Sequence, residues 1–150
     1  MRVFAGSVAK GGGDPGETVR VESASGQFLA WAAFSPSSQI RVRAWSFDES
    51  ERIDAEFFQR RVQAAVAMRA RLGIQSNGVR LVHGEGDLLP GLVVDRYGAT
   101  LSLQTLTEAM DQRKEWLLDR LVQLTGATTV IERNDVAARR HEGLDPQRKG

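Results

Sequence analysis

Four short runs of strand-forming residues, separated by stretches rich in Gly, Pro and Ser, occupy residues 1–47. Runs of this length between tight-turn sequences predict a small all-β module. They are "VFAGSVA", "TVRVES", "FLAWAAF" and "IRVRAWSF". The glycines Gly11 to Gly13 predict a loop and not a phosphate-binding turn, because no Lys-Ser/Thr pair and no helical pattern follow them.

A helical pattern replaces the strand pattern after Asp54. Apolar residues recur at helical spacing between Phe58 and Leu72, Asp54 is placed to act as the N-cap, and Gly73 is placed to end the helix. The pattern predicts one helix of about 18 residues that connects the β module to a second subdomain.

The rest of the chain predicts a mixed domain followed by a tail. The predicted elements are strands near residues 79–83, 91–96 and 100–106, a helix near 110–124 ended by Gly126, and a strand from Thr128. The order strand-strand-strand-helix-strand after a β module makes the expected fold class α+β. The tail lacks apolar periodicity and is expected to be loose. The expected divisions are 1–50 for the β module, 51–73 for the connector helix, 74–135 for the middle α+β domain and 136–150 for the tail.

The stretch "VHGEGDLLPGLVVDRYG", residues 82–98, gathers ionisable side chains between glycines. In an extended strand, the spacing of His83, Glu85 and Asp87 would place all three on one face, as a metal site requires. The glycines between them favour a turn with positive φ angles instead, and no second His lies nearby. A structural turn is therefore preferred to a partner-facing loop, and a metal site comes last. The residues assigned to this structural turn are His83, Gly84, Glu85, Gly86, Asp87, Pro90, Gly91 and Asp95.

The composition of this chain excludes several kinds of catalytic and metal site. It has no Cys, so it offers no thiolate to a metal or a substrate. Its second histidine, His141, lies in the tail, and no Gly-x-Ser-x-Gly elbow occurs. No stretch approaches the roughly 20 apolar residues that span a bilayer, and no signal peptide opens the chain. We therefore expect a cytoplasmic protein with no catalytic, cofactor-binding or metal-ligating residues and no membrane segment.

The strand-like run "QIRVRAWSF" combines cations with an aromatic residue. A period of two places Arg41, Arg43 and Trp45 on one face and apolar residues on the core face. Guanidinium and indole groups in a row are suited to phosphates and unpaired bases, which predicts RNA contact. The alternative is a structural face whose arginines pair with acids and whose Trp packs under the connector helix. Net charge does not decide between them, because the chain carries only +1, although 17 of its 20 basic residues are Arg.

Four longer segments follow one another in a familiar order: "VFAGSV", "FLAWAAFSPSSQIRVRAWSFD", "RLVHGEGDLLPGLVVDRYG" and "IERNDVAARRHEGL". Together they resemble the amino-terminal half of the bacterial S-adenosylmethionine-dependent large-subunit rRNA 5-methylcytosine methyltransferase I family. The resemblance runs from Val3 to Leu144 and is most specific in residues 80–98. It implies a PUA-like β-barrel module that binds RNA, a middle domain, and a Rossmann-like methyltransferase domain after them.

The chain also departs from that family pattern. The family's module begins with an additional strand and a His-Pro-Trp, whereas this chain starts at Met1-Arg2-Val3. It carries no glycine-rich cofactor turn and no Asn-Pro-Pro motif, and methylation at cytosine C5 needs a thiolate that a chain without Cys lacks. The Rossmann-like catalytic domain is therefore expected to be absent. No catalytic role falls on the turn residues, and S-adenosylmethionine is expected only for the full-length parent.

The resemblance implies the RNA-binding and substrate-positioning part of an rRNA methyltransferase, not catalytic alone, with ribosomal RNA as its partner. Two alternatives stay open. One is a freestanding RNA-binding protein, and the other is a noncatalytic module that self-associates through the strand edge near Met1. A homodimer is also left open by the sequence.

Overall fold

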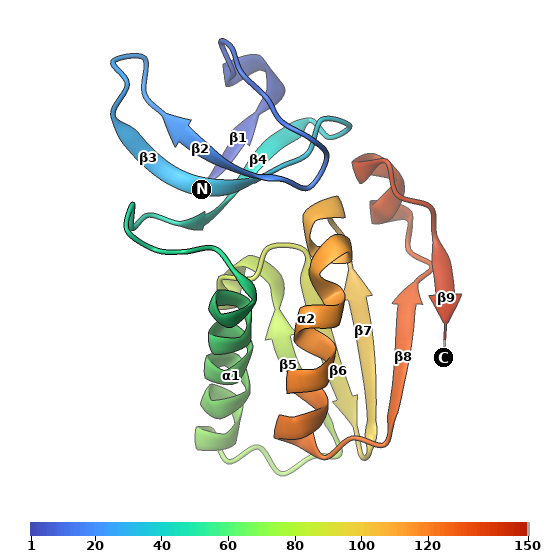
Figure 1. The fold of residues 1–150 in the computed structure, drawn as a ribbon. Helices are drawn as coiled ribbons and strands as arrows, with labels where there is room; N and C mark the ends of the chain where they lie inside the picture. The colour runs from blue at the N-terminus through green and yellow to red at the C-terminus, as the bar shows by residue number, and fades with distance from the viewer. Residues whose placement is uncertain (150) are drawn as a thin grey trace.

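Two β-sheets with separate strand orders form the framework of the chain (Figure 1). The structure is a computed structural model that describes residues 1–149. The N-terminal sheet has the order β1-β4-β3-β2, and all its pairs are antiparallel. Its strands are β1 (Arg2–Phe4), β2 (Thr18–Glu22), β3 (Phe28–Phe34) and β4 (Ile40–Ser46), with the short 3₁₀ helix η1 (Ala5–Ser7) after β1.

The N-terminal sheet differs in one respect from the expected β-barrel. Its outer strands β1 and β2 do not pair with each other, so the four described strands form an open sheet. The physical reason is the shortness of β1, whose three residues pair with β4 alone and then turn into η1. Closure of a barrel needs a continuous ladder on every strand edge.

The second sheet has the order β5-β6-β7-β8-β9. Its strands are β5 (Gly78–His83), β6 (Leu92–Tyr97), β7 (Thr100–Thr105), β8 (Thr129–Asn134) and β9 (Gln147–Lys149). Only the β7–β8 pair is parallel, since α2 (Glu108–Thr125) carries the chain back between them. The helices α1 (Ala55–Arg71) and α2 lie side by side over one face of this sheet (Figure 1). The α+β class and the order strand-strand-strand-helix-strand are confirmed.

Both long helices begin at side-chain caps. The carboxylate of Asp54 accepts a hydrogen bond from the backbone N–H of Phe57 at 3.0 Å, which confirms the predicted N-cap of α1. Thr107 caps α2 in the same way through the N–H of Met110, so that helix begins two residues earlier than its apolar pattern predicts. Gly126, at φ +68°, ends α2 as predicted.

One apolar core joins the two sheets. Trp45 of β4 is 2% exposed and packs edge-to-face on Phe58 of α1, with ring centroids 4.9 Å apart. Phe58 in turn belongs to the cluster that fills the space between the helices and the second sheet. The far face of the N-terminal sheet has only a small cluster of its own, centred on Ala32, Phe34 and Val42. The N-terminal sheet therefore packs against α1 through the face that carries Trp45.

The tail forms regular structure as far as Lys149, contrary to the expectation that residues 136–150 are loose, and residue 150 lies outside the described residues. It forms the 3₁₀ helix η3 (Ala137–Glu142) and the strand β9, which pairs antiparallel with β8. Arg139 is 1% exposed and Glu142 is 5% exposed. The tail is held by buried polar contacts, so it shows no apolar periodicity. No helix in the described part of the chain is both long and apolar enough to cross a membrane.

Candidate functional site

A cleft of about 910 Å³ lies between the N-terminal sheet and the second sheet. One side is lined by β1, β4 and the loop before β4, and the other by the ends of β5 and β6 and the turn between them. The helix η3 supplies a third side. Three segments that are far apart in the sequence therefore meet around one hollow.

The turn between β5 and β6 is the 3₁₀ helix η2 (Gly84–Asp87). Asp87 fixes it by accepting hydrogen bonds from both terminal nitrogens of Arg69, at 2.6 and 2.8 Å, and from the backbone N–H of His83 at 2.6 Å. Burial by itself would raise the pKa of the Asp87 carboxyl, but the Arg69 guanidinium and the His83 N–H outweigh it and hold the pKa below its ordinary value of 3.8. Asp87 is thus a structural anion of the turn.

The other predicted turn residues lie at the two ends of η2. Gly84 has a positive φ of +52°, as expected, but Gly86 does not, and the left-handed position is taken instead by Leu88 at φ +60°. Gly91 has φ +88°, and a Cβ there would collide with the Thr107 side chain, so only glycine fits.

Asp95 lies farther along β6 and is 9% exposed. Its carboxylate accepts two hydrogen bonds from the Arg80 guanidinium on β5, at 2.8 and 3.1 Å. Pro90 lies directly before Gly91, where the chain enters β6. These residues shape the β5–β6 connection, whose η2 residues and Gly91 line the cleft, whereas Asp95 and Pro90 do not.

Ion pairs cross the cleft from the N-terminal sheet to the second unit. The Arg2 guanidinium lies 2.8 Å from the carboxylate of Glu85 in η2. Arg43 of β4 donates to Glu142 of η3 at 2.7 Å and lies 3.7 Å from Glu85. The hydroxyl of Ser38 also donates to Glu142, at 3.0 Å. Glu142 and Arg43 are nearly buried, so this pair is shielded from solvent and from salt more than the Arg2 pair is.

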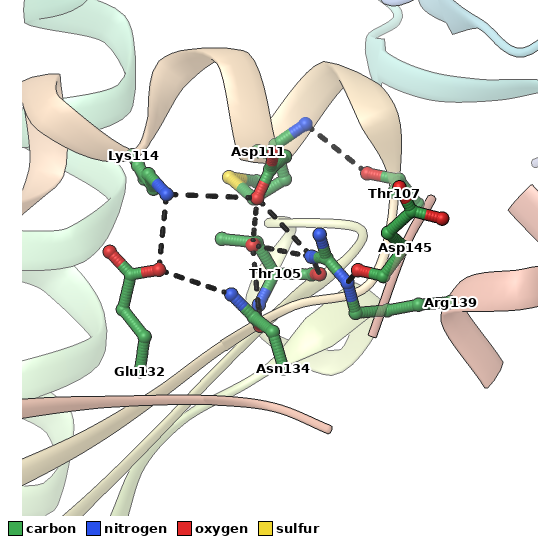
Figure 2. Close-up of polar contacts among 9 residues, drawn as sticks. Thr105, Thr107, Asp111, Lys114, Glu132, Asn134, Arg139 and Asp145 are labelled. Carbon is green, nitrogen blue, oxygen red and sulfur yellow. Dashed lines mark hydrogen bonds and ion pairs between the residues drawn. The ribbon is translucent and has the colours of Figure 1, made fainter. Parts of the chain in front are cut away.

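A buried arginine holds η3 against the end of the second sheet (Figure 2). One terminal nitrogen of Arg139 donates to the Thr105 hydroxyl at 3.1 Å and lies 3.2 Å from the Asp111 carboxylate. Its Nε donates to the backbone carbonyl of Asp145 at 3.0 Å. Asn134 completes the link to β8 by accepting the backbone N–H of Thr105 at 2.9 Å. The next residues of η3 are thereby placed at the cleft.

Two of those residues, Arg140 and His141, have no acidic partner among the described residues. Arg140 and His141 line the cleft and are exposed, and no ion pair joins either of them to an acid within residues 1–149. In the same described part of the chain, no group of three His, Asp or Glu side chains is placed to hold a metal ion. The η3 side of the cleft therefore presents hydrogen-bond donors and positive charge.

Comparison with known proteins shows what the chain is similar to. Residues 2–47 match the sequence profile of a PUA-like domain. The ribosomal RNA large subunit methyltransferases I of Erwinia tasmaniensis and Escherichia coli are each 42% identical to this chain, over 147 and 148 residues, and that of Klebsiella pneumoniae is 40% identical over 147. These alignments cover 95% of the chain. Over nearly its whole length the chain is therefore similar to ribosomal RNA large subunit methyltransferases I. It spans 37% of the length of these relatives.

Two solved structures share the fold of this chain. A candidate SAM-dependent methyltransferase from Streptococcus mutans superimposes with a TM-score of 0.74 over 88% of this chain and 35% of its own, at 16% identity. A candidate methyltransferase complexed with SAH superimposes with a TM-score of 0.70 over 79% of this chain and 32% of its own, at 17% identity. At this identity the likeness concerns the fold alone.

The described residues of this chain do not fit S-adenosylmethionine, the methyl donor. Only β7, α2 and β8 form a parallel strand-helix-strand unit within residues 1–149. The connection from β7 to α2 is Leu106-Thr107, without glycine, and the Thr107 hydroxyl already accepts the N–H of Met110. A nucleotide-type cofactor needs close backbone approach and free N–H groups at such a turn.

The three residues predicted for RNA contact have different surroundings. Trp45 is buried against α1, so its indole cannot stack on a base, and this part of the prediction is corrected. Arg41 donates to the backbone carbonyl of Pro36, and only Arg43 lines the cleft. The face of β4 that carries Arg43 and Trp45 is covered by α1 and η3, which strand periodicity alone does not reveal.

Sequence reasoning missed the cleft residues of η3. Arg140, His141 and Glu142 lie in a segment expected to be loose, yet they form the third side of the cleft. The signal that could have found them is the segment "IERNDVAARRHEGL", which carried the family resemblance and contains the buried Arg139.

Proposed function

We propose that this chain is the RNA-binding and substrate-positioning part of an S-adenosylmethionine-dependent large-subunit rRNA cytosine-C5 methyltransferase and is not catalytic alone. The observation that carries the proposal is the identity of 40–42% to ribosomal RNA large subunit methyltransferases I over 95% of the chain. The PUA-like match at residues 2–47 supports an RNA-binding role. The site for the methyl donor and the thiolate would come from parts of the longer methyltransferases that lie outside these residues. The whole protein would act on ribosomal RNA in the cytoplasm.

RNA binding is tested by fluorescence anisotropy with fragments of large-subunit rRNA over a range of salt concentrations. We expect the logarithm of the affinity to fall linearly with the logarithm of the salt concentration, by about 0.7 for each phosphate neutralised on a single strand. No measurable affinity at low salt would overturn the proposal.

Substrate positioning is tested by competition. Excess chain added to a longer methyltransferase relative should slow methylation of the rRNA fragment, because both would occupy the same part of the RNA. The inhibition should be relieved by more RNA and unaffected by more methyl donor. Binding without competition would instead favour the freestanding RNA-binding alternative.

Self-association is the third alternative, and the structure gives it little support. The edge strand β1 offers only three residues for pairing with another copy. Short edge strands are one of the ways in which proteins avoid edge-to-edge association. Sedimentation of the chain without RNA over a hundredfold range of concentration would detect a dimer.

A further inference from the structure

An exposed aromatic ring lies at the cleft described above. Phe4, the last residue of β1, lines the cleft and is 57% exposed. An apolar ring left in contact with water costs free energy unless a ligand covers it, and a flat ring at the wall of a hollow can stack on a nucleobase. Phe47 is also exposed, at 64%, but it lies outside the cleft, so exposure alone does not single out Phe4.

The charges of the cleft are unevenly satisfied. Arg2 and Arg43 are each neutralised by an acid that also lines the cleft, Glu85 or Glu142. Arg140 has no such partner within residues 1–149, and His141 beside it can donate a hydrogen bond or carry a proton. The lining thus holds three Arg against two Glu, which leaves a positive excess on the η3 side.

The position of that charge is fixed by its neighbour in the chain. Arg139 is buried and tied to β7 and α2, so the short helix that presents Arg140 and His141 cannot shift freely (Figure 2). A phosphate site gains from this arrangement, since less conformational freedom is lost when the anion binds.

We propose that the cleft binds one unpaired nucleotide of RNA, with its base stacked on Phe4 and its phosphate held by Arg140 and His141. A volume of about 910 Å³ lies within the range of small-ligand pockets, which suits one nucleotide. Stacking requires an exposed base face, so the RNA must be single-stranded at this point. The inference rests on the proposed function, and it assigns the contact to residues other than Arg41 and Trp45.

The test measures binding of a fluorescent single-stranded RNA of ten nucleotides to the whole chain and to four variants. Phe4→Ala and the pair Arg140→Ala/His141→Ala alter the proposed contacts. Phe47→Ala removes an equally exposed ring, and Arg71→Ala removes an exposed Arg on α1, both outside the cleft. Circular dichroism and thermal melting confirm that each variant is folded, which the exposure of all these side chains favours.

We expect Phe4→Ala to weaken binding about tenfold, the loss of one base-aromatic stack. The Arg140→Ala/His141→Ala pair should weaken binding and reduce the salt slope by about 0.7, while the two control variants bind like the original chain. If the original chain binds and the cleft variants match the controls, or if a duplex competes better than the single strand, the cleft proposal is overturned and RNA binding lies elsewhere. If the original chain does not bind RNA at all, the proposed function itself fails.

Discussion

At the scale of single residues, Asp87 shows how one carboxylate can define a turn. Its side chain is 7% exposed and is held by the Arg69 guanidinium and the His83 backbone N–H. Because these contacts keep its pKa below the ordinary value of 3.8, the ionised form is favoured in the folded chain. The resulting stability is present above the unfolded pKa and is lost as the pH falls through the folded pKa.

We expect Asp87→Asn to lower the free energy of unfolding by about 3 kcal/mol at neutral pH, since a nearly buried Arg69 would lose its counter-ion. The variant should also lose less stability than the original chain as the pH drops below about 4. Urea unfolding at a series of pH values measures both effects. Asp119→Asn, at an exposed position on α2, is the control and should change neither. An unchanged acid dependence in Asp87→Asn would assign the acid loss to other carboxylates.

Leu88 is the one residue other than glycine with a positive φ in the described chain. It is 59% exposed at φ +60°, so its side chain gains little from burial while its Cβ opposes the left-handed backbone. Leu88→Gly should therefore raise the free energy of unfolding by up to about 1 kcal/mol. Thermal melting checks the direction. A fall in the melting temperature would show that the contacts of the Leu88 side chain stabilise the fold more than its left-handed backbone destabilises it.

At the scale of elements, local patterns predicted what local interactions decide. Asp54 caps α1 and Gly126 ends α2 because capping depends on residues only a few positions away. The burial of Trp45 could not be assigned from its strand, since alternation gives two faces but not which of them another unit covers. The structure of η3 could not be predicted either, because the residues that fix Arg139, Thr105 and Asp111, are distant from it in the sequence.

The anchoring of η3 by Arg139 leads to a prediction for this element. Arg139→Met would remove the donor to the buried Thr105 and the cation beside the partly buried Asp111 carboxylate, and it should destabilise the chain by about 3 kcal/mol. Amide hydrogen exchange in η3 should accelerate more than exchange in β6. Arg139→Lys keeps the charge without the forked geometry and should recover only part of the loss. Equal acceleration in η3 and β6 would mean that Arg139 supports the whole second unit and not η3 in particular.

At the scale of the whole molecule, the stability of the N-terminal sheet depends on its partner. The sheet's own cluster is small, whereas Trp45 and Ala33 from β4 and β3 belong to the large cluster built on α1 and the second sheet. A shared core of this kind couples two units into one cooperative unfolding transition. The cleft between them keeps its shape only while that coupling holds, because its lining comes from both units.

Trp45→Ala should break this coupling. Truncating a buried Trp costs about 3 to 5 kcal/mol, and here the loss falls on the contact between the units. We expect amides of β3 and β4 to exchange well before those of β6 and β7 in the variant, whereas in the original chain all four strands exchange in one global event. Trp31→Ala, on β3 but outside the shared cluster, is the matched control and should keep the single transition.

The indole N–H of Trp45 has no hydrogen-bond partner within residues 1–149, so Trp45→Phe should retain most of the coupling. A single transition that survives in Trp45→Ala would place the coupling in the ion pairs of Arg43 with Glu142 and of Arg2 with Glu85, and adding Arg2→Ala and Arg43→Ala should then separate the two units.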